Sequence, residues 1–340
     1  MLSDSGQAES FLYDGEVTDT FAVLDGDLLV CSNNAISLYS GSGTRYVSQA
    51  VSLDNPVVES NGSVAVVYDA GGSDLYVLGQ RELIWSTDEL DTILAARLNK
   101  NGQLTVVTQA SRHRGAVTVY DAAYRPVMSV RISSAFVMDA ALSDDGHTLA
   151  ILTIGQDEGD FSSSLSLYTL NSALNAAEES ADFVPEQVFD LGGNVVLSLR
   201  HTRERVWALG ERGLSILSHG EDAAWVDWSD RYLKSYDLSG DEFAVALLGK
   251  YRAGSQAVLL SLDGNGTTLG RLEVSEQVLS LSVAGDFIAV LTGDRLDIYT
   301  RDLSLYSSLE GTQGARKALL MEDGSAILIS ADRARFHVPS

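Results

Sequence analysis

The residues best suited to chemistry are two short basic clusters in a strongly acidic chain. The 340 residues include 23 Lys and Arg against 47 Asp and Glu, which gives a formal net charge of −24. The clusters are Arg112, His113 and Arg114, within "QASRHRGA", and Lys250, Tyr251 and Arg252, within "LGKYRAGSQ". Arginine can grip a carboxylate in two places, and positive charge on an acidic background attracts anions. These six residues predict a binding site for a carboxylate or a partner's acidic segment, and the alternative is that they are solvated loop tips.

Other residue patterns give little support for catalysis or metal binding. The single cysteine, Cys31, lies in the apolar run "DLLVCS", so no intramolecular disulfide or thiolate cluster can form, and we expect a buried thiol. The nucleophile motif G-x-S-x-G does not occur. The run "DGNGTTLG" at 263–270 lacks the spacing of a phosphate or calcium loop and predicts a hairpin turn. Metal-ligand spacing is absent among the five histidines: His113, His147, His201, His219 and His337. We predict no catalytic residue, no metal and no cofactor.

Two acidic groups are weaker candidates for holding a cation. The run "GQDEGD" at 155–160 gathers hard oxygen ligands on one hairpin, without a fixed calcium-loop spacing. Asp19, Asp139 and Asp237 fall on predicted innermost strands, where they could line a central channel. In both cases we favour the alternative, namely solvated or turn-capping carboxylates.

The net charge and the hydropathy pattern argue against nucleic-acid binding and membrane insertion. A net charge of −24 repels phosphate backbones and anionic lipid surfaces, so we expect no nucleic-acid partner. The N-terminal "MLSDSGQAESF" has no basic start and no apolar core, and no run approaches about 18 apolar residues. We expect a chain that is soluble as given and does not insert into a membrane itself. The sequence leaves open an N-terminal anchor absent from this chain.

The remaining residues form the elements that must position these clusters. Alternating segments rich in Val, Leu, Ile and Tyr follow one another with almost no helical periodicity. Asp-Gly or Asn-Gly pairs, which accept the positive φ angles of tight hairpins, recur at 25–26, 61–62, 101–102, 145–146 and 323–324. The chain is predicted to be all-β.

The spacing of the turns predicts four-stranded repeats. The glycines at 26, 62, 102 and 146 lie about 36, 40 and 44 residues apart, which is the length of a propeller blade. Similar turns near 204, 240, 285 and 324 bring the count to eight blades. A tyrosine recurs at one place in the third strand and is predicted to pack against the neighbouring sheet: Tyr39, Tyr120, Tyr168 and Tyr299.

The ends of the chain predict how the last blade is completed. The final repeat stops after its third strand, "RARFHV", whereas "ESFLYDG" at 9–15 precedes the first complete repeat. We predict that 9–15 pairs as the fourth strand of blade 8 and protects an open sheet edge. Blade 4 is longer because of an insertion at 171–187, which we predict to be a surface loop, with a partner-docking element as the alternative. Residues 1–340 are predicted to form a single domain.

Over essentially its whole length the pattern resembles the β-propeller superfamily, specifically the eight-bladed WD-repeat-like and quinoprotein-like propellers. The segments "TVYDA" and "DIYTRD" resemble the third strand of WD repeats, and "RELIWSTDE" around Trp85 resembles the outer strand of quinoprotein blades. The chain also looks like uncharacterised propeller ectodomains that Gram-positive bacteria tether behind one N-terminal helix. That resemblance implies a surface location.

The regular fold without a catalytic constellation predicts a non-enzymatic binding or scaffold module, a monomer that takes a protein or peptide partner. Because strands alternate in direction, the turns between second and third strands emerge on the same side as the connections between blades. Both basic clusters lie in unusually long turns of that kind, so this side is predicted to be functional. The alternative is a propeller hydrolase or lyase with its site at the channel mouth. A quinoprotein-like dehydrogenase is disfavoured because the repeated tryptophan motif is missing.

Overall fold

The computed structural model describes residues 10–15, 19–157, 160–170, 184–220 and 223–339, except for the side chain of Asp157. Regular secondary structure in these residues is entirely β, arranged in eight four-stranded antiparallel sheets. Seven sheets hold four strands in chain order, and the eighth takes its fourth strand from the N-terminus. The chain is an eight-bladed β-propeller, as the turn spacing predicted. No helix long and apolar enough to cross a bilayer occurs in the described part.

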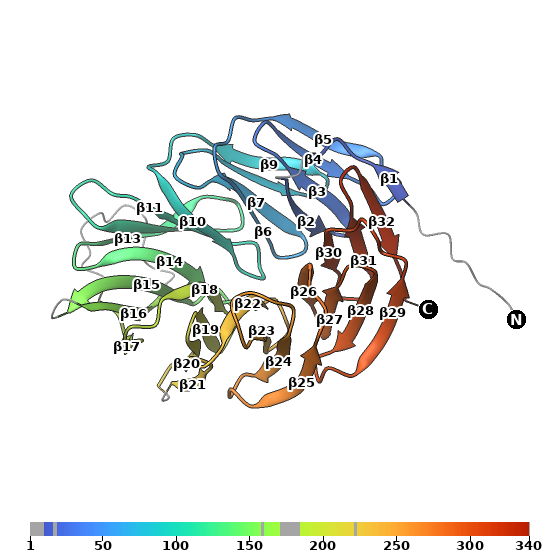
Figure 1. Cartoon of the computed structure of the whole chain (residues 1–340). Helices are drawn as coiled ribbons and strands as arrows, with labels where there is room; N and C mark the ends of the chain where they lie inside the picture. Colours follow the sequence, from blue (N-terminus) through green and yellow to red (C-terminus); the bar gives the residue numbers. More distant parts are fainter. Residues whose placement is uncertain (1–9, 16–18, 158–159, 171–183, 221–222, 340) are drawn as a thin grey trace, which may run out of the picture. The chain divides into compact units, whose positions relative to one another are not determined.

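The chain divides into two compact units, which are described separately. The first unit holds blade 1 and blades 6 to 8 (Figure 1). Blade 1 consists of β2 (Thr20–Leu24), β3 (Asp27–Cys31), β4 (Ala35–Tyr39) and β5 (Arg45–Ala50). Blade 6 consists of β22 (Tyr232–Asp237), β23 (Phe243–Gly249), β24 (Ala257–Asp263) and β25 (Thr268–Val274). Blade 7 consists of β26 (Ser280–Ala284), β27 (Phe287–Leu291), β28 (Arg295–Thr300) and β29 (Leu305–Glu310). Blade 8 consists of β30 (Lys317–Leu320), β31 (Ala326–Ile329), β32 (Arg333–His337) and β1 (Ser10–Leu12).

The second unit holds blades 2 to 5. Blade 2 consists of β6 (Pro56–Ser60), β7 (Val64–Asp69), β8 (Leu75–Gly79) and β9 (Glu82–Thr87). Blade 3 consists of β10 (Ile93–Leu98), β11 (Leu104–Thr108), β12 (Gly115–Tyr120) and β13 (Pro126–Ile132). Blade 4 consists of β14 (Phe136–Leu142), β15 (Thr148–Asp157), β16 (Asp160–Thr169) and β17 (Gln187–Asp190). Blade 5 consists of β18 (Val196–His201), β19 (Arg205–Gly210), β20 (Gly213–Ser218) and β21 (Ala224–Asp227).

The strands of each blade are called A to D in chain order, with β1 as strand D of blade 8. Within a blade, the A–B and C–D turns lie on one side and the B–C turn on the other, because neighbouring strands are antiparallel. The connections that lead from one blade to the next also lie on the B–C side. We use "A–B side" and "B–C side" for these two sides of a blade.

The predicted closing strand is confirmed, although it is shorter than 9–15. Phe11 of β1 pairs with Ala334 of β32, and the two strands lie side by side in Figure 1. The Phe11 ring is buried, with its centroid 5.7 Å from that of Tyr39. The Tyr13 hydroxyl donates a 2.7 Å hydrogen bond to the backbone oxygen of Ser330. An edge that would otherwise expose unpaired backbone groups is therefore covered by the chain's own N-terminal strand.

Apolar clusters lie between neighbouring blades within each unit. The recurring tyrosine of strand C faces the preceding blade: Tyr120 packs in the cluster between blades 2 and 3, and Tyr168 in the cluster between blades 3 and 4. Tyr39 and Tyr299 pack in the same way in the first unit. The predicted packing role of the repeated tyrosine is confirmed.

The predicted insertion of blade 4, 171–187, follows the third strand, and its last residue, Gln187, already belongs to β17. Residues 171–183 of the insertion lie outside the described residues, so its two interpretations stay predictions. The assignment of 1–340 to a single domain also stays a prediction.

Candidate functional site

The first basic cluster forms the B–C turn of blade 3, between β11 and β12. Arg112, His113 and Arg114 are all exposed there. The guanidinium carbon of Arg114 lies 4.5 Å from the centroid of the Phe136 ring, at the start of β14. His113 Nδ1 lies 2.7 Å from the hydroxyl of Ser133. The turn thus presents cations directly beside an aromatic ring of the next blade.

The second basic cluster forms the B–C turn of blade 6, between β23 and β24, in the other unit. Lys250, Tyr251 and Arg252 are exposed. The Lys250 ammonium lies 5.5 Å from the centroid of the Tyr251 ring. Each turn therefore brings its own three residues together, and each combines cations with a neighbouring aromatic ring. The use of both turns for binding stays a prediction.

Sequence reasoning missed a set of exposed apolar side chains on the B–C side of blades 4 and 5. Phe136 is 53% exposed, and Phe161, the second residue of β16, is 70% exposed. Val195, just before β18, is also exposed. Together with the adjoining Arg112–Arg114 turn, these side chains make up what we call the mixed surface. Exposed apolar side chains on one side of neighbouring blades are candidates for an interaction site.

Bulges in three consecutive inner strands extend the exposed apolar area. The register of strand A shifts at Leu94 in β10, at Met138 in β14 and at Leu197 in β18. All three side chains are exposed, and Met138 is 50% exposed. A bulge inserts one residue that has no partner on the neighbouring strand and re-aims its side chain. Strict alternation along a strand gives no warning of this, which is why the sequence pattern did not reveal these residues.

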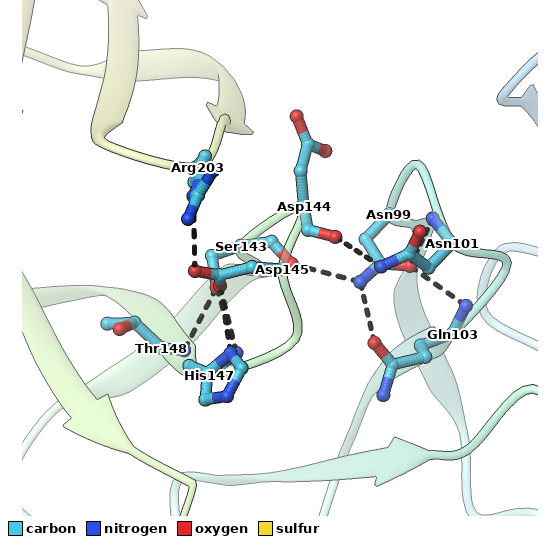
Figure 2. A network of polar contacts seen from close by, with 9 residues as sticks. All are labelled: Asn99, Asn101, Gln103, Ser143, Asp144, Asp145, His147, Thr148 and Arg203. Atoms are coloured by element: carbon cyan, nitrogen blue, oxygen red, sulfur yellow. Dashed lines mark hydrogen bonds and ion pairs between the residues drawn. The ribbon is translucent and has the colours of Figure 1, made fainter.

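The A–B side of the second unit is instead connected by hydrogen bonds from blade to blade (Figure 2). Asn99 Nδ2 donates to the backbone oxygen of Ser143 at 2.9 Å, and Asn101 Nδ2 donates to that of Asp144 at 2.7 Å. Asp145 lies 3.9 Å from Arg203 of the next turn. These contacts join the A–B turns of blades 3, 4 and 5. The side chains that make them therefore have a structural role.

The carboxylate of Asp145 is held in its charged form within this network. Burial alone would raise its pKa, but hydrogen bonds from the Ser143 hydroxyl and from the His147 backbone lower the pKa below its ordinary value. His147 Nδ1 lies 3.4 Å from Asp145. The arrangement is typical of a charged turn cap.

The aspartates on or beside the innermost strands also make contacts within the protein. Arg97 of β10 donates from Nε to both oxygens of Asp139 at 2.9 Å, and its far end lies 3.5 Å from Glu59. Asp237 accepts a 2.8 Å hydrogen bond from the backbone nitrogen of Val283. Asp19 is buried before β2. Asp237 also accepts from the backbone nitrogen of Ser239, which fits the predicted turn-capping alternative, whereas Asp139 is buried and paired with Arg97 and so is neither solvated nor a turn cap.

The remaining sequence candidates give no catalytic arrangement. Burial raises the pKa of Cys31 to about 12, so the thiol stays protonated. Burial lowers the pKa of His201 to about 4, and its Nδ1 lies 3.2 Å from the backbone oxygen of Ala141. The run 263–270 forms the β24–β25 hairpin, as predicted. Residues 158–159 of the acidic hairpin lie outside the described residues. In the described part, no group of three or more His, Cys, Asp or Glu side chains is arranged to hold a metal.

Comparison with known protein families gives one assignment. Residues 8–330 match the model of a family of unknown function, DUF5711. The chain belongs to this family. No curated protein matches the chain.

Solved structures with the same fold differ from this DUF5711 chain almost completely in sequence. The C-terminal WD40 domain of Sif2 is 12% identical, with a TM-score of 0.62 over 97% of this chain and 100% of that one. Apo AztD from Citrobacter koseri is 12% identical, with a TM-score of 0.59 over 92% and 90%. BamB from Moraxella catarrhalis is 13% identical, with a TM-score of 0.55 over 96% and 97%. These likenesses confirm the WD-repeat-like and quinoprotein-like resemblance at the level of the fold, and a fold alone does not specify a function.

Proposed function

We propose that this DUF5711 chain is a non-enzymatic binding module, a monomer that docks a protein segment on the mixed surface of blades 3 to 5. The observation that carries the proposal is the contact between Arg114 and the exposed Phe136 ring. Burial of apolar surface contributes about 25 cal/mol per Å², so exposed rings gain when a partner covers them. Arginine and aromatic side chains are the types that most often dominate binding energy at protein interfaces.

The partner segment carries acidic groups beside large apolar side chains. Most of this chain repels acidic groups because its net charge is −24. The Arg112–Arg114 turn is a local exception, and its exposed guanidinium groups leave N–H donors available for a carboxylate. With Arg114 lying against Phe136, one partner segment could place a carboxylate and an apolar side chain on adjacent groups.

The turn at Lys250–Arg252 offers the same chemistry in blade 6. Its exposed cations and the Tyr251 ring form a second, separate place for an acidic group. We extend the proposal to this turn as an additional contact. No observation on the described residues favours the alternative of a hydrolase or lyase.

A random peptide library displayed on phage tests the proposal with a partner that is still unidentified. Selection on the wild-type chain should enrich peptides that contain Asp or Glu beside Phe, Leu or Trp. The double variant Arg112→Ala/Arg114→Ala should bind these peptides about tenfold more weakly or worse, because it removes the charge-assisted hydrogen bonds. The matched control is Arg125→Ala, which removes one cation from the C–D turn of the same blade.

The result decides between the two turns and the opposite side. A loss confined to Lys250→Ala/Arg252→Ala would move the site to blade 6. Peptides whose affinity survives all four changes would overturn the assignment to the B–C side.

A further inference from the structure

Blade 7 fills the space beside its third strand with its own charged groups. Arg295 of β28 donates from Nε to Asp297 at 2.8 Å, and its far end lies 3.3 Å from Glu276. Glu276 belongs to the connection between β25 and β26. The hydroxyl of Ser308 donates to Asp297 at 2.6 Å. One guanidinium is thus held between a carboxylate of the sheet and a carboxylate of the preceding connection.

Blade 3 repeats this backbone frame without the arginine. Strand C reaches Tyr120 in blade 3 and Tyr299 in blade 7, and in both blades the register with strand D shifts immediately before the tyrosine. Counting back four residues from each tyrosine places Ala116 where blade 7 has Arg295. A methyl group therefore stands at the position of the long cationic side chain.

The surroundings of that position are partly retained. Thr118 of blade 3 pairs with Ser129, as Asp297 of blade 7 pairs with Ser308. Glu89 lies two residues after the end of β9. Glu276, the corresponding carboxylate before blade 7, lies two residues after the end of β25. Blade 3 therefore has the connection's carboxylate, Glu89, but no internal guanidinium beside it.

A cavity lies beside Ala116, the residue that stands where blade 7 has Arg295. Ala116, Thr118 and Ser129 line a space of about 370 Å³ that Glu89 also borders. Pockets for small ligands begin at about 300 Å³, so this space suits a molecule of amino-acid size. Its floor is made of short side chains and hydroxyl groups that can donate and accept hydrogen bonds.

The cavity carries both signs of charge. Glu89 and Asp91 lie on the connection between β9 and β10, whereas Arg131 lies on β13 and His113 on the B–C turn. Arg131 pairs with Ala116 across the sheet, at the position where blade 7 has Glu310. None of Glu89, Asp91 and Arg131 forms an ion pair with another described side chain. The charges are therefore available to a ligand.

We propose that this cavity of blade 3 binds an arginine-like zwitterion, a small molecule or chain end that has a guanidinium or ammonium group at the end of its side chain and a free carboxylate. The side-chain cation binds at Glu89 and Asp91, with Glu89 in the place that Glu276 holds beside Arg295 in blade 7. The carboxylate end binds at Arg131, with His113 beside it. This site goes beyond the proposed function, since it needs no docked protein, and its binding is measured without one.

Isothermal titration of the whole chain with three probes tests the proposal. L-arginine should bind in a saturable manner, whereas L-citrulline, whose side chain ends in a neutral ureido group, and agmatine, which lacks the carboxylate, should each bind about tenfold more weakly. No saturable binding of L-arginine, or equal binding of L-citrulline, would overturn the proposal. Glycyl-arginine as a fourth probe distinguishes the source: affinity equal to that of L-arginine assigns the C-terminus of a peptide, and weaker affinity assigns the free amino acid.

Two variants locate the binding in this cavity. Ala116→Arg rebuilds the arrangement of blade 7 and should abolish L-arginine binding, whereas Ala122→Arg, which adds the same charge on the exposed C–D turn, should leave it unchanged. Arg131→Gln should weaken L-arginine about tenfold without changing agmatine, because only the carboxylate contact is lost. The Arg131 variant keeps the test decisive if Ala116→Arg fails to fold. An equal loss of both probes in Arg131→Gln would contradict the assigned orientation.

Discussion

The two sides of blades 3 to 5 differ in what their turn side chains contact. On the A–B side, Asn99 and Asn101 each donate to a backbone oxygen of the next blade's turn, so their polar groups are consumed within the protein. On the B–C side, Arg112, Arg114 and Phe136 are exposed, and the rings and charges there face solvent. Polar side chains thus join neighbouring turns on the A–B side, whereas charged and aromatic side chains on the B–C side are exposed to contacts with other molecules.

This difference shows on which side of a blade the turn length and the strand register can vary. The A–B turns are short, five of the eight carry an Asp-Gly or Asn-Gly pair, and side-chain contacts join those of blades 3, 4 and 5. The B–C turns differ in length, and strand A, which begins on that side, carries bulges at Leu94, Met138 and Leu197. Turn length and strand register can vary on the B–C side because the hydrogen-bonded turns on the A–B side hold neighbouring blades together.

The largest effect should come from breaking a buried contact that completes a blade. Phe11→Ala should lower the free energy of unfolding by about 3 to 5 kcal/mol, because it empties a buried aromatic site between β1, β32 and Tyr39. Leu12→Ala in the same strand is the matched control, since that side chain is 63% exposed. Urea denaturation gives both values. Removal of Met1–Asp14 should lower the melting temperature further, and an unchanged melting temperature would contradict closure by this strand.

A smaller effect should separate the two sides directly. Asn99→Ala should cost about 2 to 3 kcal/mol, because it leaves the buried backbone oxygen of Ser143 without this donor and removes the acceptor for Gln103. Phe136→Ala on the B–C side should change the free energy of unfolding by about 0.5 kcal/mol or less. Equal losses in the two variants would show that the B–C ring is structural and would break the comparison.

The smallest of these effects is pH-dependent and belongs to the packing of blades 4 and 5. Because burial lowers the pKa of His201 from 6.5 to about 4, the unfolded chain binds a proton between these values that the folded chain does not. The stability contributed by the neutral ring is fully present above about pH 6.5 and is lost as the pH falls toward 4. The free energy of unfolding should fall by about 2 kcal/mol between pH 7 and pH 5 through this group. His201→Asn keeps a donor toward Ala141 without titrating, so its urea denaturation curves should lack this part of the loss.

The fold was predictable because its information is local. Gly26, Gly62, Gly102, Gly146 and Gly324 all adopt φ between 76° and 95°, the left-handed region that a tight turn needs and that glycine adopts without strain. The Asp-Gly or Asn-Gly pair therefore predicted each of these turns, and the spacing of the turns predicted the number of blades. The recurring tyrosine was recognised for the same reason, since its place in strand C is a matter of counting.

The candidate sites were only half predictable because they depend on contacts between blades. The charge of Arg112 and Arg114 could be read from the sequence, but the Phe136 ring beside Arg114 comes from the next blade. The bulge at Met138 changes which face its side chain occupies, and alternation cannot foresee that. The cavity at Ala116 became interpretable only after the strand pairing aligned blade 3 with blade 7.

The central claim, that the mixed surface binds a partner and does not hold the fold, is tested most directly by one double variant. Arg114→Ala/Phe136→Ala should be measured for affinity to a peptide selected on the wild-type chain and, in the same sample, for melting temperature. The account predicts a loss of affinity of about tenfold or more with a melting temperature within about 2 °C of wild type. Unchanged affinity, or a loss that appears only together with a large drop in melting temperature, would contradict it.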